Sequence, residues 1–68
     1  MPTIKSLCDP VGITIMDLVR EAGLAYETAK KILDNEPVAR RSIVKALSYI
    51  NRELGTSHTP ETVSANQL

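Results

Sequence analysis

The chain is 68 residues long, with eight basic and eight acidic side chains and therefore a formal net charge of zero. A chain of this length holds one small domain, so a large catalytic cleft is not expected. The single cysteine and the single histidine cannot form an intramolecular disulfide or complete a structural zinc site. We expect no cofactor, and no enzyme, because no nucleophile and base pair or phosphate-binding glycine loop is present.

Nothing in the chain indicates a membrane or a secreted protein. No apolar run approaches the roughly 20 residues that are needed to span a bilayer. Residues 1–5 lack the basic and apolar regions of a signal peptide. Because Cys8 has no partner cysteine, a reducing compartment suits the chain. We therefore expect a cytoplasmic protein that makes no contact with a membrane.

The first half of the chain predicts two short helices. Thr3 is a candidate N-cap for the first of them, which Pro10 should end early. The second begins after Thr14, whose hydroxyl can cap backbone N–H groups, and Asp17 follows three residues later. Gly23 is well placed to stop this helix in a left-handed conformation. Its buried face is expected to comprise Ile15, Leu18, Val19 and Ala22, at the i, i+3, i+4, i+7 spacing of an amphipathic helix.

Two further helices are predicted, and a polar segment follows them. Only Leu24 separates Gly23 from a third helical pattern, over about residues 25–34. Its apolar face comprises Ala25, Ala29, Ile32 and Leu33. A fourth helix is expected over about residues 39–54, with Gly55 as its stop. Its apolar stripe comprises Ile43, Leu47, Ile50 and Leu54.

We therefore expect an all-α domain over residues 1–55, a compact four- to five-helix bundle that contains a helix-turn-helix. Residues 56–68 contain only two aliphatic side chains larger than alanine. Such a segment cannot bury enough apolar surface to offset its ordering entropy, so a disordered polar tail is predicted there.

The two helices that meet at Gly23 resemble a known DNA-binding superfamily. Residues 12–18 and 21–24 are similar to the start of lambda-repressor/Cro-like domains, in which a glycine, an aliphatic residue and a capping threonine introduce the first motif helix. Tyr26, Thr28 and residues 31–34 are similar to the headpiece of the lac-repressor-type regulators. The resemblance covers roughly residues 12 to 55 and implies a lambda-repressor-like fold. Ala25 departs from it, because a capping serine is common at that position.

The polar arc of the third helix is the expected base-reading face, because it lies opposite the apolar stripe. Glu27 can accept a hydrogen bond from a cytosine amino group, and Tyr26 can contact a base edge or a thymine methyl group. Lys30 or Lys31 can reach a guanine or a phosphate. The plainer alternatives are an ordinary solvated face for the lysines and a partly buried ring for Tyr26.

Contacts to DNA phosphates are expected beside this face. The resemblance implies them for Thr14 and Thr28, and Arg40 and Arg41 can meet the backbone from the start of the last helix. The two arginines can also serve only to solubilise that helix. The net charge of zero counts against nucleic-acid binding, but six of the eight basic side chains fall after residue 29, so a locally basic face is possible.

The function predicted from the sequence is a sequence-specific DNA-binding transcriptional regulator of phage or mobile-element type, and the resemblance implies a repressor. Its expected partner is double-stranded DNA with a palindromic operator, bound by a homodimer, because one small headpiece makes too few contacts for tight binding. Tyr49 is one candidate for the dimer contact. No small-molecule ligand is implied. The alternative is a protein-interaction module such as an antitoxin or an anti-repressor, which the neutral charge favours.

Overall fold

The helices of the chain begin and end largely where capping residues and glycines stand. The computed structural model describes residues 1–68 and contains four α-helices, one 3-10 turn and no strand. The elements are α1 (Ile4–Cys8), η1 (Asp9–Val11), α2 (Ile15–Glu21), α3 (Tyr26–Leu33) and α4 (Arg40–Leu54). This confirms the prediction of a compact, all-helical domain. No helix is long and apolar enough to cross a bilayer.

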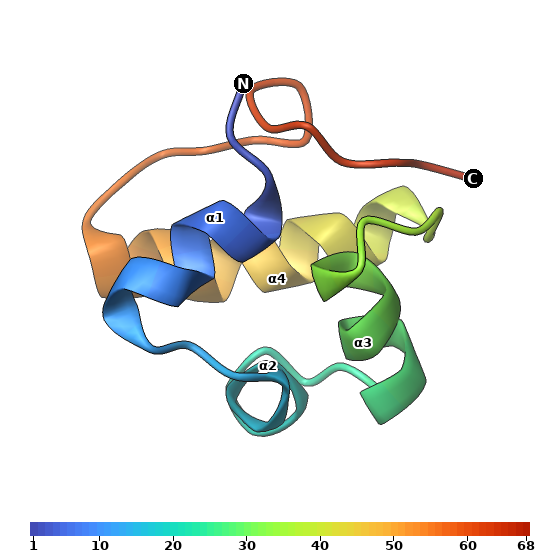
Figure 1. The fold of residues 1–68 in the computed structure, drawn as a ribbon, viewed down its shortest axis with the longest axis horizontal. Helices are drawn as coiled ribbons and strands as arrows, with labels where there is room; N and C mark the ends of the chain where they lie inside the picture. Colours follow the sequence, from blue (N-terminus) through green and yellow to red (C-terminus); the bar gives the residue numbers. More distant parts are fainter.

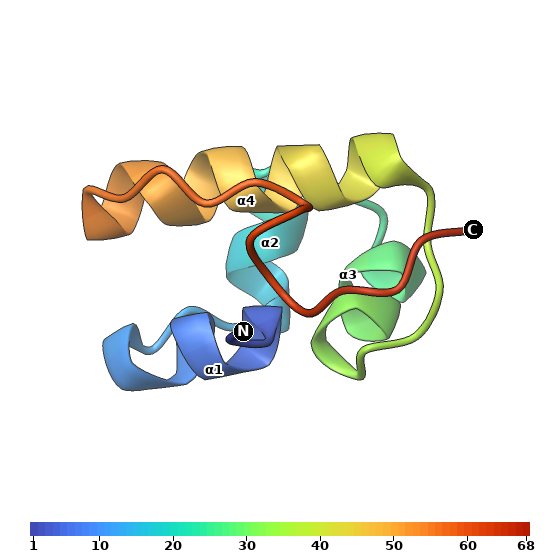
Figure 2. The ribbon, with the colours of Figure 1, turned by 90° about the horizontal axis from the view of Figure 1, so that it is seen from above.

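The longest helix, α4, forms one side of the molecule, and the shorter helices pack against it (Figures 1 and 2). In Figure 1, α4 runs horizontally behind α1, α2 is seen end on below them, and α3 lies at the right. Figure 2 shows α1 and α4 as two separate layers, and α2, which lies below both in Figure 1, runs across the gap between them. The core therefore lies in the space that all four helices surround.

The core is aliphatic, as the composition requires. Within α4, three residues of the predicted stripe are buried, Ile43, Leu47 and Ile50, and the fourth, Leu54, is partly buried against the same cluster. Leu18 of α2 is fully buried as well. Four core residues lie outside the helices, in the connections and in the C-terminal segment: Ile13, Leu24, Val38 and Val63. The connections thus contribute to the same hydrophobic cluster as the helices.

The start of α3 differs from the prediction. The apolar pattern predicts Ala25 on the buried face, but in the structure its side chain is exposed. Ala25 is the N-cap of α3, with φ −64° and ψ 148°, which is the position at which the resemblance has a capping serine. Leu24 is buried in its place. No side chain caps α3, because alanine has no hydrogen-bond acceptor. The first turn of α3 is therefore left with backbone N–H groups that no cap residue satisfies.

Replacing Ala25 by serine is expected to stabilise the protein. The extended backbone of Ala25 is the conformation in which a serine side chain caps a helix, and such a cap contributes about 1 kcal/mol. For a domain of this size we expect the melting temperature to rise by about 4–8 °C. Ala25→Val is the matched control, because it fills the same exposed position without an acceptor. An equal effect of the two substitutions in a thermal melt would contradict the expectation.

The only cysteine lies in the core. Cys8 is completely buried at the end of α1, and burial, together with the nearby Asp9 carboxylate, raises the pKa of its thiol from 9.0 to about 11. The neutral thiol is the form that the fold accepts. The stability that the buried neutral Cys8 thiol contributes is therefore fully present below the pKa of this thiol in the unfolded chain. It is lost as the pH rises through the pKa of the thiol in the folded protein.

We expect the Cys8 thiol to be unreactive in the folded protein. At pH 8 only about one thiol in a thousand is ionised when the pKa is about 11, and the thiolate is the reactive form. Labelling by an aromatic disulfide reagent should therefore be slow in buffer and fast after denaturation in urea. Complete labelling within seconds at pH 8 without denaturant would show that the site is open.

The segment after Gly55, for which disorder was expected, is packed against the helices in the structure. Residues 56–68 cross the molecule above α4 and α1 and pass the N-terminus on the way to the α3–α4 connection (Figures 1 and 2). Within this segment Val63 is 1% exposed and Pro60 is buried. We refer to residues 56–68 as the strap. Val63 belongs to the same core cluster as the buried residues of the helices, so the strap is packed through this side chain although it has few apolar residues.

Hydrogen bonds hold both ends of the strap. At its start, the Asn51 side chain of α4 donates to the His58 carbonyl (2.8 Å) and accepts from the His58 N–H (2.9 Å). In the middle, the Ser64 N–H donates to the Pro2 carbonyl (2.7 Å). At the far end, the Leu68 N–H donates to the Val38 carbonyl (3.0 Å). The strap thus links α4, the N-terminal segment and the connection that precedes α4.

Candidate nucleic-acid interface

The connection between α2 and α3 sets the direction of α3. The α2 helix begins with a reciprocal cap between Thr14 and Asp17 and ends at Glu21, with Ala22 as its C-cap. Gly23 then takes φ 72°, a left-handed conformation that side chains other than glycine adopt with strain. Leu24 is buried, and its N–H donates to the Leu18 carbonyl (3.3 Å). The backbone therefore turns sharply, and α3 runs in a direction different from that of α2 (Figure 1).

The polar side of α3 faces solvent over its whole length. Ala29 and Ile32 are buried on the inner side, while Tyr26 is 53% exposed. The other predicted base-reading residues, Glu27, Lys30 and Lys31, are also exposed. Together with Glu36, these four residues line one shallow depression on the surface. The structure thus brings the predicted base-reading residues together on a single exposed face.

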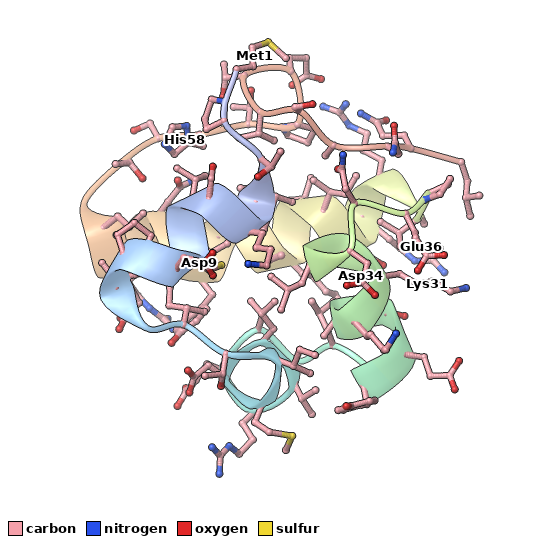
Figure 3. The ribbon with its side chains drawn as sticks, in the orientation of Figure 1. Met1, Asp9, Lys31, Asp34, Glu36 and His58 are labelled. Atoms are coloured by element: carbon pink, nitrogen blue, oxygen red, sulfur yellow. The ribbon has the colours of Figure 1, made fainter.

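The two lysines of this face differ in their surroundings. Lys30 Nζ lies 3.1 Å from a carboxylate oxygen of Asp34, one helical turn later. This hydrogen bond and the charge of Asp34 raise the pKa of Lys30. Lys31 makes no ion pair. Figure 3 shows Lys31 extending outward at the edge of the molecule, so it is the cation of α3 that is free to meet a ligand.

The residues predicted to contact phosphates are dispersed over different parts of the surface. Thr28, Lys31 and Arg41 line one hollow between α3 and the start of α4. Arg40 instead lines the groove between α4 and the strap, where it forms an ion pair with Glu61. Thr28 and Arg41 are therefore placed beside the exposed face of α3, and Arg40 is held away from it.

The hydroxyl of Thr14 already forms hydrogen bonds within the protein. It donates to an Asp17 carboxylate oxygen (3.1 Å) and accepts from the Asp17 N–H (3.3 Å). The backbone N–H of Thr14 donates to the same carboxylate (2.9 Å), and these bonds lower the pKa of Asp17. A phosphate next to Thr14 would meet a negative charge, so this residue is better explained as the cap of α2.

Sequence reasoning missed the contributions of residues outside α3 and α4. Glu36 borders the depression on α3, Glu61 pairs with Arg40, and Leu68 borders the hollow that contains Thr28 and Arg41. The only signal for the strap in the sequence is a single valine between polar residues, which does not identify the helices that it packs against.

Comparisons with protein-family models, curated proteins and solved structures found no match to this chain. The exposed face of α3 and its neighbours are therefore the basis on which a function can be proposed.

Proposed function

We propose that the protein is a sequence-specific DNA-binding transcriptional regulator, a repressor, in which α2 and α3 form a lambda-repressor-like helix-turn-helix. The observation that carries the proposal is the exposed polar face of α3, which follows a sharp turn at Gly23 and is anchored by Ala29 and Ile32. An α-helix with its side chains is about 10–12 Å in diameter, and the major groove of B-DNA is about 12 Å wide. An element of this size can therefore enter the groove.

Each exposed residue of α3 has a role that its chemistry suits. Glu27, in the first turn, accepts from a cytosine amino group, and Tyr26 contacts a thymine methyl group with its ring. Lys31, which has no carboxylate partner, donates to a guanine edge or a phosphate. Thr28 and Arg41, in the neighbouring hollow, bind the backbone and fix the register of α3. Lys30 contributes less, because Asp34 compensates its charge.

A symmetric homodimer on a palindromic operator remains part of the proposal. Tyr49 is not available for the dimer contact, because it is buried, with the Arg52 guanidinium carbon 5.7 Å from the centre of its ring. Val44 is 42% exposed on the outer side of α4 and is the apolar residue there that a second copy can cover. The molar mass from light scattering, with and without a palindromic duplex, shows whether the protein is a dimer.

The alternative is a protein-interaction module such as an antitoxin or an anti-repressor. The net charge of zero favours it, since phosphate binding draws on excess positive charge. The two functions differ in their response to salt. DNA binding through several phosphates weakens steeply as salt rises, whereas binding through an apolar surface hardly changes.

Selection of duplexes from a random DNA pool tests the proposal. The wild type should recover a palindromic sequence at moderate salt, and the Lys30→Ala/Lys31→Ala double variant should not. The double variant is expected to fold, because both lysines are exposed. Recovery of no sequence at either low or moderate salt would refute DNA binding and favour the protein-interaction function.

A further inference from the structure

The strap lies beside most of the residues that are proposed to bind phosphates. Its Glu61 pairs with Arg40, and its last residue borders the hollow that Thr28 and Arg41 line. Three of the four residues that the sequence assigns to phosphates thus neighbour the strap, and only Thr14 does not. A segment of this kind is placed to influence how these residues meet DNA.

The ion pair with Glu61 holds Arg40 in the groove between α4 and the strap, outside the hollow that Thr28 and Arg41 line. Arg40 is the first residue of α4 and directly precedes Arg41, which lines the hollow on the other side. Glu61 is the only carboxylate that pairs with Arg40. The pair is half exposed on both sides, so water and other anions can reach it. A phosphate oxygen presents the same charge to the guanidinium that the carboxylate does.

The anchors of the strap keep Glu61 next to Arg40. An exposed ion pair between two mobile side chains contributes little, because ordering them offsets most of the attraction. Here the backbone of the strap is fixed by Asn51 on one side of Glu61 and by buried Val63 on the other. The carboxylate is thus held beside Arg40 at a high local concentration, which strengthens its competition with an external anion.

We propose that Glu61 acts as a built-in competitor of DNA phosphate for Arg40, so that the strap restrains DNA binding while it is docked. This inference rests on the proposed function, because it concerns the regulation of the same surface. When the strap lifts, or when Glu61 loses its charge, Arg40 gains the freedom to add one phosphate contact beside Arg41.

The test is the substitution Glu61→Gln, measured by fluorescence anisotropy with the operator duplex recovered by selection, or with a random-sequence duplex if none is recovered. Each additional phosphate contact steepens the slope of log K against log salt by about 0.9. We therefore expect the variant to bind about threefold to tenfold more tightly at low salt, with a slope steeper by about 0.9. Thermal melts check that the variants are folded.

Two controls separate release of Arg40 from a general change of charge. Glu53→Gln removes the same charge near the C-terminal end of α4, where no ion pair is broken. This substitution should change the affinity and the salt slope less than Glu61→Gln does. In an Arg40→Gln background, Glu61→Gln should lose most of its effect.

The outcomes distinguish this inference from the proposed function. If the wild type and the Glu61→Gln variant bind the duplex equally, the competition is refuted and DNA binding stands. If the increase persists in the Arg40→Gln background, Arg40 is not the residue released, and the inference is refuted as well. If neither protein binds any duplex at low salt, both the function and the inference fail.

Discussion

Replacing Val63 by aspartate is expected to lower the stability of the protein more than any other substitution described for it. Val63 is 1% exposed within the core cluster, and a carboxylate there has no partner. Burying an unpaired charge costs at least about 4 kcal/mol. The total stability of a domain of this size is only about 3–10 kcal/mol. We expect the melting temperature to fall by more than about 15 °C.

Thr62→Asp is the matched control for this substitution. Thr62 is exposed and adjacent to Val63, and its hydroxyl accepts from the Thr59 N–H (2.8 Å), a role that a carboxylate can take over. The control should therefore melt within a few degrees of the wild type. If the Val63→Asp variant melts there too, the strap does not belong to the folded core.

Replacing Lys31 by alanine is expected to weaken binding of the operator about fivefold to 150-fold, since a specific base contact contributes about 1–3 kcal/mol. If Lys31 binds a phosphate instead, the affinity falls equally for all sequences and the salt slope becomes shallower by about 1. The side chain is exposed and makes no ion pair, so the stability should change little. Titrations with operator and random duplexes at several salt concentrations separate the two roles.

Lys45→Ala is the control, because it removes the same charge from an exposed position on α4. Lys45 lines a different hollow, with Glu21, Tyr49 and Arg52. Its removal should leave the preference for the operator unchanged. Equal losses from the two substitutions would mean that only the overall charge matters and that α3 does not read the sequence.

Local signals in the sequence predicted most of the helical part of the fold. Thr14 and Asp17 are three residues apart and form the reciprocal cap that opens α2, and Gly55 ends α4 in a left-handed conformation. These features depend on a few neighbouring residues, and for that reason the sequence reveals them. The apolar pattern predicts Ala25 on the buried face of α3, but it is exposed at the N-cap, because a small apolar alanine fits either position.

The position of the strap and the partners of the two arginines depend on contacts between residues that are distant in the sequence. Local sequence patterns carry no information on such contacts. Asn51 is seven residues from His58, and nothing in its neighbourhood indicates that its side chain will bind the strap. Arg40 and Arg41 are equivalent in the sequence, but one pairs with Glu61 and the other lines the hollow of α3. By contrast, the ion pair between Lys30 and Asp34 can be predicted from the sequence, because their spacing of four residues is the usual one for helical ion pairs.

The hydrogen bond between the Ser64 N–H of the strap and the Pro2 carbonyl has a consequence for synthesis of the protein. The α1 helix leaves the ribosome before the strap does, because the strap is encoded after it. Until Val63 emerges, the nascent chain exposes the apolar surface that this residue covers, so the helices form early while their final packing waits for the strap. Translation itself thus sets the earliest moment at which the domain is complete.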